Sequence, residues 1–189
     1  LTSNKQYLKA VEDTWQSIMD TEINITGSGS AMEAWFGGKA IQYAPIKHYQ
    51  ETCVTATWLK LSRQLLLLTG NCKYADAIEQ TFYNALLGAM RQEGAGWAKY
   101  TPLSGQRLPG SQQCNMGLNC CEASGPRGLF SVPDIAVMQG KHGVTICFYM
   151  LGVYQVTSPQ GQKITLTQEG NYENLGEIQM SLKMPKEEE

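Results

Sequence analysis

Four side chains from two distant stretches of the sequence could together hold a soft metal ion. Glu51 and Cys53 belong to the tripeptide ETC, and the adjacent pair Cys120 and Cys121 follows Cys53 after about 67 residues. Tetrahedral zinc takes sulfur, nitrogen and oxygen ligands, and thiolates select zinc, copper(I) or iron–sulfur clusters over magnesium and calcium. Because there is no Cys-x2-Cys pair, a second interpretation stays open: the cysteines fill a core, and Glu51 is a first-turn carboxylate favoured by the helix dipole.

The tripeptide ETC stands at the start of a predicted helix. Apolar residues recur at helical spacing over 52–69, and the pattern ends at Gly70. Positions i and i+2 of a regular helix lie about 200° apart around its axis. Glu51 and Cys53 therefore reach one point only if this segment is a turn or the first helical position.

Glu33 is a further candidate, because it follows a break in the helical pattern. The segment TGSGS (26–30) ends the first amphipathic stretch with two glycines, and Glu33 comes next in SAMEAWF. Segment 94–113 is rich in glycine and proline and contains Trp97 and Tyr100. It is too long for an ordinary connector, and such loops are usually functional.

The remaining cysteines and both histidines have no partner at metal-ligand spacing. For Cys72 and Cys147 we expect packing roles, whereas Cys114 lies near the cysteine pair and its role stays open. His48 and His142 are expected to serve as surface or core hydrogen-bonding residues.

The elements that must position these residues are helical first and extended later. Helices are predicted over 4–20, 52–69, 74 to about 91 and, as a short piece, 126–138; strands are predicted over 143–150, 163–168 and 177–184. The second and third helices are joined by a short turn and should form an antiparallel pair. The expected core residues are Trp15, Trp58, Leu65 and Phe82.

Composition excludes several functional classes. The chain has 189 residues, 42% of them hydrophobic and 17% charged, with a net charge of −2. This apolar content excludes an intrinsically disordered chain, and the lack of basic excess argues against a nucleic-acid binder that relies on bulk charge. No stretch approaches the roughly 20 apolar residues of a membrane span. Six cysteines also leave open a disulfide-bearing secreted module, with Cys53 or Cys114 bonded to one of the adjacent pair.

The order of motifs resembles that of a known enzyme family. The sequence ITGSGSAMEAW is followed by ETC opening an apolar helix, by YADAIEQTFYNALLGAM, and by a loop ending in CC. This order resembles the β-L-arabinofuranosidase-type glycoside hydrolases, family 127 and its relatives, over about residues 20–182. The resemblance implies the C-terminal part of an (α/α)6 barrel over 1–140, followed by the first strands of a β-sandwich over 141–189. It also implies that the chain is a fragment of a longer enzyme.

The resemblance assigns roles to individual residues. It implies that zinc is the cofactor, that Cys120 is the nucleophile, that Glu33 is the general acid/base, and that Tyr100 in WAKYTPL contacts the substrate. The zinc ligands that it implies are Glu51, Cys53, Cys120 and Cys121.

The resulting expectation is a retaining glycoside hydrolase that releases L-arabinofuranose or a related sugar from plant-type glycans. Its partner is an oligosaccharide or glycan, and neither nucleic acid nor a membrane span is expected. An isolated fragment is expected to be inactive, or to depend on the rest of its catalytic domain or on another copy. A bacterial periplasmic or extracellular location is favoured over the cytoplasm. The alternative is a non-catalytic carbohydrate-binding barrel with a structural zinc site.

Overall fold

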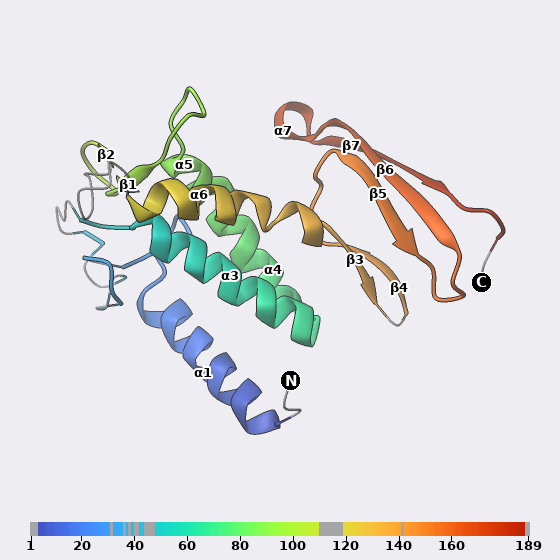
Figure 1. Cartoon of the computed structure of the whole chain (residues 1–189), viewed down its shortest axis with the longest axis horizontal. Coiled ribbons are helices and arrows are strands. Elements are labelled where there is room, and N and C mark those ends of the chain that lie inside the picture. Colours follow the sequence, from blue (N-terminus) through green and yellow to red (C-terminus); the bar gives the residue numbers. More distant parts are fainter. Residues whose placement is uncertain are drawn as a thin grey trace. The chain divides into compact units, whose positions relative to one another are not determined.

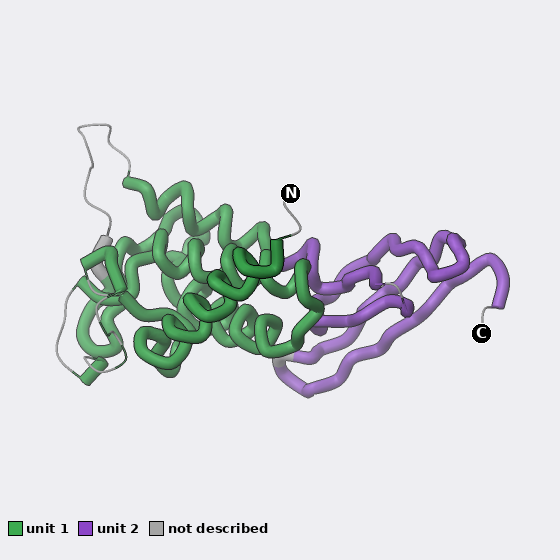
Figure 2. Tube along the Cα trace, turned by 90° about the horizontal axis from the view of Figure 1, so that it is seen from below, with its two compact units in different colours: residues 1–131 green, residues 132–189 purple. Residues whose placement is uncertain are grey.

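The chain folds into two compact units, residues 1–131 and 132–189 (Figure 2). The computed structural model describes residues 4–30, 32–35, 37, 39, 42–43, 48–109, 119–140 and 142–187. Cys114, whose role the sequence left open, lies outside the described residues.

The first unit is mainly helical (Figure 1). Its elements are α1 (Lys5–Thr21), α3 (Thr52–Thr69), α4 (Cys72–Gln80), the π-helical segment η1 (Thr81–Leu86), α5 (Leu87–Ala89), β1 (Ala98–Tyr100), β2 (Leu108–Pro109) and α6 (Cys120–Phe130). The predicted helix over 52–69 is confirmed, and the predicted first helix is confirmed to within one residue at each end. The short helix predicted over 126–138 exists, but its predicted bounds are wrong, because α6 begins at Cys120 and ends at Phe130.

Helices α3 and α4 form a helical hairpin. Gly70 ends α3 in the left-handed conformation at φ 67°, which costs glycine little because it has no Cβ. The side chain of Asn71 then accepts a hydrogen bond from the Lys73 amide and starts α4. One glycine and one capping residue thus reverse the chain between two helices.

Aromatic side chains build the core of the first unit. The rings of Trp15 and Trp58 stack with centroids 5.2 Å apart, and Tyr74 meets Trp15 edge-on at 4.8 Å. The Trp15 indole N–H donates to Ser62 Oγ at 2.9 Å, which satisfies its polar atom inside the core. All four predicted core residues, Trp15, Trp58, Leu65 and Phe82, are buried.

The third predicted helix contains a π-helical segment where the glycine-rich loop packs against it. The buried Thr81 hydroxyl lies 2.6 Å from the Gly27 carbonyl and 2.7 Å from the Ala77 carbonyl. A Cβ on Gly27 would lie 2.6 Å from the Thr81 backbone nitrogen, so only glycine fits there. This contact fixes the loop that leads to Glu33.

The second unit consists mainly of antiparallel strands. Its elements are the 3-10 turn η2 (Pro133–Ile135), β3 (Val137–Gly140), β4 (Gly143–Ile146), β5 (Gly152–Thr157), β6 (Lys163–Asn171), the short helix α7 (Tyr172–Leu175) and β7 (Glu177–Lys183). Strands β3 and β4 pair as a hairpin, and β5, β6 and β7 form a sheet in that order. The predicted strand over 143–150 is too long, since it ends at Ile146, and β3 and β5 were missed.

The two units together give a mixed fold of helices followed by strands, as the sequence predicts. Among the described residues, no helix has the length and apolar character needed to cross a bilayer.

Candidate metal centre and active site

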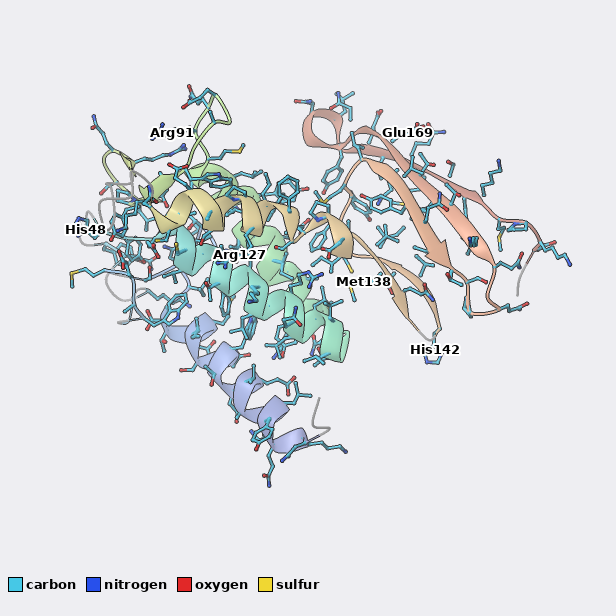
Figure 3. The ribbon with its side chains drawn as sticks, in the orientation of Figure 1. His48, Arg91, Arg127, Met138, His142 and Glu169 are labelled. Carbon is cyan, nitrogen blue, oxygen red and sulfur yellow. The ribbon has the colours of Figure 1, made fainter. Side chains whose placement is uncertain are left out.

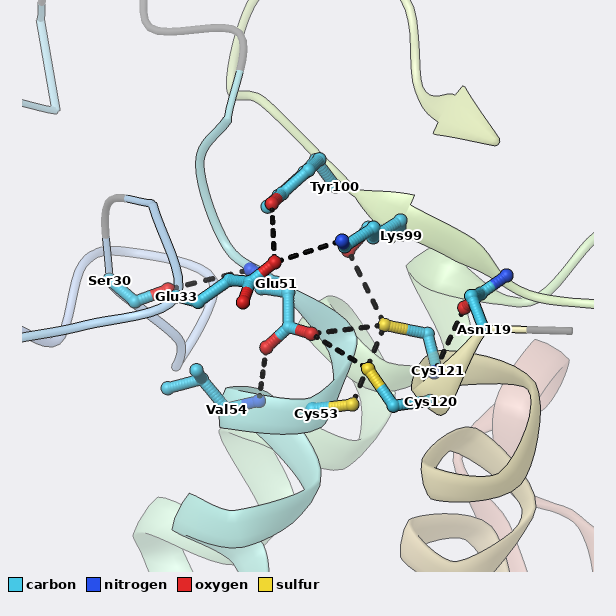
Figure 4. Close-up of polar contacts among 10 residues, drawn as sticks. All are labelled: Ser30, Glu33, Glu51, Cys53, Val54, Lys99, Tyr100, Asn119, Cys120 and Cys121. Atoms are coloured by element: carbon cyan, nitrogen blue, oxygen red, sulfur yellow. Dashed lines mark hydrogen bonds and ion pairs between the residues drawn. The ribbon is translucent and has the colours of Figure 1, made fainter. Parts of the chain in front are cut away.

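Glu51, Cys53, Cys120 and Cys121 converge on one point (Figure 4). Their potential ligand atoms all lie within 4.8 Å of one another. The Cys53 and Cys121 sulfurs are 3.6 Å apart, and Glu51 Oε1 lies 3.2 Å from Cys121 Sγ and 3.6 Å from Cys120 Sγ. Two sulfurs bound to one tetrahedral zinc at about 2.3 Å each would be about 3.7 Å apart. The cluster could therefore hold a metal ion, and its donor types are ones that zinc accepts.

The start of α3 brings Glu51 and Cys53 to this point. Glu51 is the N-cap of α3, with an extended backbone at φ −66° and ψ 133°, and its Oε2 accepts a hydrogen bond from the Val54 amide. Cys53 is the second residue of the helix. The sequence argument required a turn or a first helical position at this place, and the cap meets that condition.

The start of α6 supplies the other two sulfurs. Asn119 is the N-cap, and its side-chain oxygen accepts a hydrogen bond from the Cys121 amide at 2.9 Å. Cys120 and Cys121 are therefore the first two helical residues, the former exposed and the latter buried. Pro126 lies inside α6 rather than at its start, because Asn119 caps the helix and α6 begins at Cys120, six residues before Pro126.

Two helix N-termini meet at the cluster. Unpaired backbone N–H groups give a helix N-terminus partial positive charge, which favours anions such as thiolates. The pKa of Cys53 is lowered to about 7, chiefly by a hydrogen bond with Cys121. Burial raises the pKa of Cys120 to about 12, and the hydrogen bond with Cys53 together with burial raises that of Cys121. A bound divalent cation would reverse these upward shifts, because it favours the thiolate form.

Strand β1 connects the cluster of Glu51, Cys53, Cys120 and Cys121 to Glu33. Tyr100 pairs with Glu51 in an isolated β-bridge, and the Thr52 hydroxyl donates to the Ala98 carbonyl at 2.7 Å. The Lys99 carbonyl lies 4.0 Å from Cys121 Sγ. The strand is thus fixed against the first turn of α3, with its middle residue beside a sulfur of the cluster.

Glu33 is held by the side chains of β1. Glu33 Oε1 lies 2.9 Å from the Lys99 ammonium and accepts a hydrogen bond from the Tyr100 hydroxyl at 2.9 Å. The Lys99 contact, followed by that of Tyr100, lowers the pKa of Glu33. Burial raises the pKa of Tyr100 to about 12, so this hydroxyl stays protonated at neutral pH. The arrangement therefore keeps Glu33 ionised.

The backbone around Glu33 is strained. Glu33 has φ 68°, and Ser30, Met32 and Gln50 also have left-handed φ values of 80°, 49° and 53°. Residues other than glycine rarely adopt this conformation, and they do so where surrounding contacts hold them. Here the Gln50 amide donates to the Ser30 carbonyl at 3.3 Å, and the Met32 amide donates to the His48 carbonyl at 2.9 Å. These bonds join the Glu33 loop to the segment that precedes ETC.

Sequence reasoning missed two residues beside Glu33. Lys99 lies in WAKYTPL, where the resemblance assigns a role to Tyr100 alone, yet its side chain reaches the same carboxylate as Tyr100. His48 was expected to be a lone residue, and it is exposed (Figure 3), but its ring stacks on Tyr100 with centroids 4.8 Å apart. No spacing signal in the sequence joins His48 to Tyr100.

The other cysteine predictions had mixed outcomes. The expectation of a packing role for Cys72 is wrong, because Cys72 is exposed at the first position of α4. Cys147 is half-buried, and burial raises its pKa. The disulfide interpretation is contradicted for Cys53, Cys120 and Cys121, because none of the three forms a disulfide.

Comparison with known proteins places these motifs in one family. The family model for the β-L-arabinofuranosidase GH127 catalytic domain matches residues 1–134. The chain belongs to the GH127 family. The resemblance read from ITGSGSAMEAW, ETC and CC is therefore confirmed at the level of the family. A comparison with curated proteins found no match.

Solved structures of GH127 proteins share this fold. The GH127 β-arabinofuranosidase BT3674 matches 96% of the chain with a TM-score of 0.79 and 28% identity. The GH127 β-L-arabinofuranosidase Ara127N from Geobacillus stearothermophilus T6 matches 90% with a TM-score of 0.70 and 19% identity. A further glycoside hydrolase matches 96% with a TM-score of 0.75 and 20% identity. The chain spans only 28%, 28% and 34% of these three proteins, respectively.

Proposed function

We propose that this chain carries the zinc-thiolate catalytic machinery of a retaining glycoside hydrolase. The substrate is a plant-type glycan with L-arabinofuranose or a related sugar at the cleaved end. The observation that carries the proposal is the convergence of three sulfurs and one carboxylate beside Glu33 in a GH127 chain. Zinc fits this donor set, because thiolates and a single carboxylate oxygen complete a tetrahedral shell.

The proposed ligands are Glu51, Cys53, Cys120 and Cys121. A bound zinc ion would lower the pKa of the coordinated thiols and so supply thiolate at neutral pH. Glu51 Oε2 is already engaged by the Val54 amide, which leaves Oε1 facing the thiols as the ligand oxygen. The two helix caps hold the ligands in place before the substrate binds.

Cys120 is the proposed nucleophile, because it is the exposed sulfur of the cluster. Its thiolate attacks the anomeric carbon, and the bond from that carbon to the leaving oxygen breaks. The leaving oxygen takes a proton from Glu33, and a thioglycosyl–enzyme forms. In the second step Glu33, now a carboxylate, accepts a proton from water, and the water oxygen displaces the Cys120 sulfur. Two displacements at one carbon retain its configuration.

The ion pair between Glu33 and Lys99 sets a condition for the first step. Glu33 can protonate the leaving oxygen only when it carries a proton, whereas Lys99 and Tyr100 lower its pKa. In the proposed reaction the sugar displaces the ammonium from Glu33 before the proton is transferred. Tyr100 is the proposed substrate contact, because its hydroxyl already lies at the reacting carboxylate.

A second function is a carbohydrate-binding protein with a structural zinc site. The observation that favours it is the filled ligand set, since four protein ligands are typical of structural zinc.

Kinetics of the full-length protein on aryl and alkyl β-L-arabinofuranosides separate the hydrolase from the carbohydrate-binding function. The variants Cys120→Ser and Glu33→Gln should each reduce turnover at least about 100-fold, and the exposed Cys72→Ser should not change it. Glu33→Gln should reduce turnover of the alkyl substrate more than that of the aryl substrate. An alkoxide is the poorer leaving group and depends more on the proton that Glu33 donates.

Unchanged turnover in Cys120→Ser would remove that sulfur from its proposed role. Absence of turnover in the full-length wild-type protein, together with sugar binding in equilibrium dialysis, would support the binding function instead. The first sugar product observed by NMR should retain the anomeric configuration of the substrate.

A further inference from the structure

Gln50 is a buried polar residue that immediately precedes the ETC motif. Only 2% of its surface is exposed, and its backbone is left-handed at φ 53°. Burying an amide side chain costs free energy unless the amide is hydrogen-bonded. A residue other than glycine keeps a left-handed conformation only where its surroundings hold it. Two unfavourable features at one position therefore require compensating contacts.

The side-chain amide of Gln50 joins two segments that lie far apart in the sequence. Its Nε2 donates to the Thr101 carbonyl at 2.8 Å, just after β1. Its Oε1 accepts a hydrogen bond from the Thr26 hydroxyl, at the start of the glycine-rich segment 26–30. A glutamine side chain has a donor end and an acceptor end, and here each end binds a different segment.

The backbone of Gln50 binds the same two segments. Its amide donates to the Ser30 carbonyl at 3.3 Å, and its carbonyl accepts a hydrogen bond from the Thr101 hydroxyl at 3.3 Å. The next amide along the chain, that of Glu51, donates to Ser30 Oγ at 3.4 Å (Figure 4). Ser30 precedes Glu33 by three residues. These bonds therefore join the loop that carries Glu33 to the turn that carries a proposed zinc ligand.

We propose that Gln50 is a positioning residue that holds the Glu33 loop at a fixed place relative to the proposed zinc ligands. The inference rests on the proposed function and deepens it, because the acid/base group and the nucleophile of a double displacement must flank the same anomeric carbon. A displacement of about 1 Å can cost about 100-fold in rate. Gln50 acts through Glu33 and has no role of its own in proton transfer.

The contacts of Gln50 differ from those of Lys99 in what the reaction does to them. Lys99 also holds Glu33, at 2.9 Å, but in the proposed reaction the sugar displaces the Lys99 ammonium. Gln50 instead binds backbone groups and hydroxyls that the reaction leaves in place. It therefore keeps the Glu33 loop in position during the step in which the ion pair is broken.

The first test measures the position of Glu33 in this chain without catalysis. Lys99 and Tyr100 hold the pKa of Glu33 below its ordinary value of 4.5, so a shift of the loop away from them should raise that pKa. We expect carbon-13 NMR of the carboxyl groups to show this rise in Gln50→Met, whose side chain has a similar length but no amide. The matched control is Gln80→Met, which removes an exposed amide that also donates to a backbone carbonyl, at 3.0 Å.

The variant Gln50→Gly separates the side chain from the backbone conformation. Glycine adopts φ 53° at little cost but has no amide. If the backbone conformation alone mattered, Gln50→Gly would keep the wild-type pKa of Glu33, whereas the proposal predicts a rise as in Gln50→Met. If the Gln50 variants fail to fold, Thr26→Val removes only the hydroxyl at one end of the amide and should give a smaller rise.

The second test is the kinetics of the full-length protein. Gln50→Met should lower turnover of an alkyl β-L-arabinofuranoside about 10- to 100-fold. It should lower turnover of an aryl substrate by less, because an aryl leaving group needs less protonation. A residue that supports only the fold would lower both rates equally. The affinity for zinc, measured by competition with a chromophoric chelator, should stay close to that of wild type.

Azide should restore part of the aryl turnover in Gln50→Met, because this anion attacks without a general base. Its nitrogen forms a bond to the anomeric carbon, the bond from that carbon to the Cys120 sulfur breaks, and the thiolate leaves. The product is a glycosyl azide. Loss of support for the fold alone would not respond to azide.

Three results would each overturn the positioning role. They are an unchanged pKa of Glu33 in Gln50→Met and Gln50→Gly, equal losses of alkyl and aryl turnover without rescue by azide, and a loss of zinc affinity as large as the loss of turnover. Absence of turnover in the wild-type protein would instead contradict the proposed function. The pKa of Glu33 would still show whether Gln50 holds its loop.

Discussion

The carboxylate of Glu51 lies between two helices and accepts a hydrogen bond from the Cys121 thiol at 3.2 Å. Its other oxygen accepts the Val54 amide and caps α3. One side chain therefore both starts a helix and completes the donor set of the cluster. Helix formation and metal binding can be separated by substitution at this residue.

We expect Glu51→Gln to keep most of the helix cap and to lose much of the zinc affinity. The amide oxygen of glutamine can still accept the Val54 N–H, but the side chain has no charge for a cation. Glu51→Ala should lose both properties, with about 0.5–2 kcal/mol of unfolding free energy attributable to the cap. Urea unfolding in the presence of a chelator measures the contribution of the cap to the free energy of unfolding. Competition with a chelator measures the affinity for zinc. Equal zinc affinities in wild type and Glu51→Gln would remove Glu51 from the ligand set.

The reactivity of the thiols should report metal binding. In chelated protein at pH 7, Cys53 should be alkylated faster than Cys120, because the pKa of Cys53 is lowered to about 7 and that of Cys120 is raised to about 12. Added zinc should protect both sulfurs, whereas the exposed Cys72 should react equally under both conditions. Mass spectrometry after differential alkylation resolves each cysteine separately. Protection of Cys72 by zinc would show that the ion binds elsewhere.

Gly125 fixes the distance between α6 and the start of β1. A Cβ at this position would lie 2.0 Å from the Trp97 ring, so Gly125→Ala must displace Trp97. We expect it to lower the unfolding free energy by about 1–3 kcal/mol. In the control Gly88→Ala the new Cβ meets nothing within 4 Å, and alanine should stabilise the helix by about 0.5–1 kcal/mol. Denaturant unfolding gives the free energy of unfolding of both variants. If Gly125→Ala leaves that free energy unchanged, the packing of α6 on Trp97 is contradicted.

The ion pair of Glu33 and Lys99 should make stability depend on pH in the acid range. The pKa of Glu33 in the folded protein is below its ordinary value of 4.5, chiefly through Lys99. The ion pair therefore contributes its full stability above about pH 4.5, and this contribution is lost as the pH falls through the lower, folded pKa. The Glu33 side chain is 44% exposed, and the solvent reduces the effect to below about 1 kcal/mol.

We expect Lys99→Met to raise the pKa of Glu33 and to reduce this pH-dependent difference, because only the smaller effect of Tyr100 would remain. Carbon-13 NMR of the glutamate carboxyl groups gives the pKa directly, and urea unfolding from pH 3 to 7 gives the stability. Glu79→Gln serves as the comparison, because this substitution removes a different carboxylate from the unit. A Glu33 pKa that does not change in Lys99→Met would refute the ion pair as its cause.

Local patterns in the sequence predicted the parts of this site that depend on one segment. The bounds of α3 follow from apolar periodicity and Gly70, and the ETC cap follows from helix geometry. The start of α6 was missed because the predicted helix begins at Pro126, whereas Asn119 caps the helix earlier. Lys99 and His48 were missed because their roles depend on tertiary contacts with Glu33 and Tyr100, which no periodicity encodes.

The left-handed backbone at Glu33 sets a trade-off for anyone who engineers this protein. Glycine would relieve the conformational cost at that position, so a screen for thermal tolerance would favour Glu33→Gly. The same exchange would delete the carboxylate on which the proposed acid and base steps depend. Selection for thermal stability alone would therefore favour a more stable protein that lacks the proposed catalytic carboxylate.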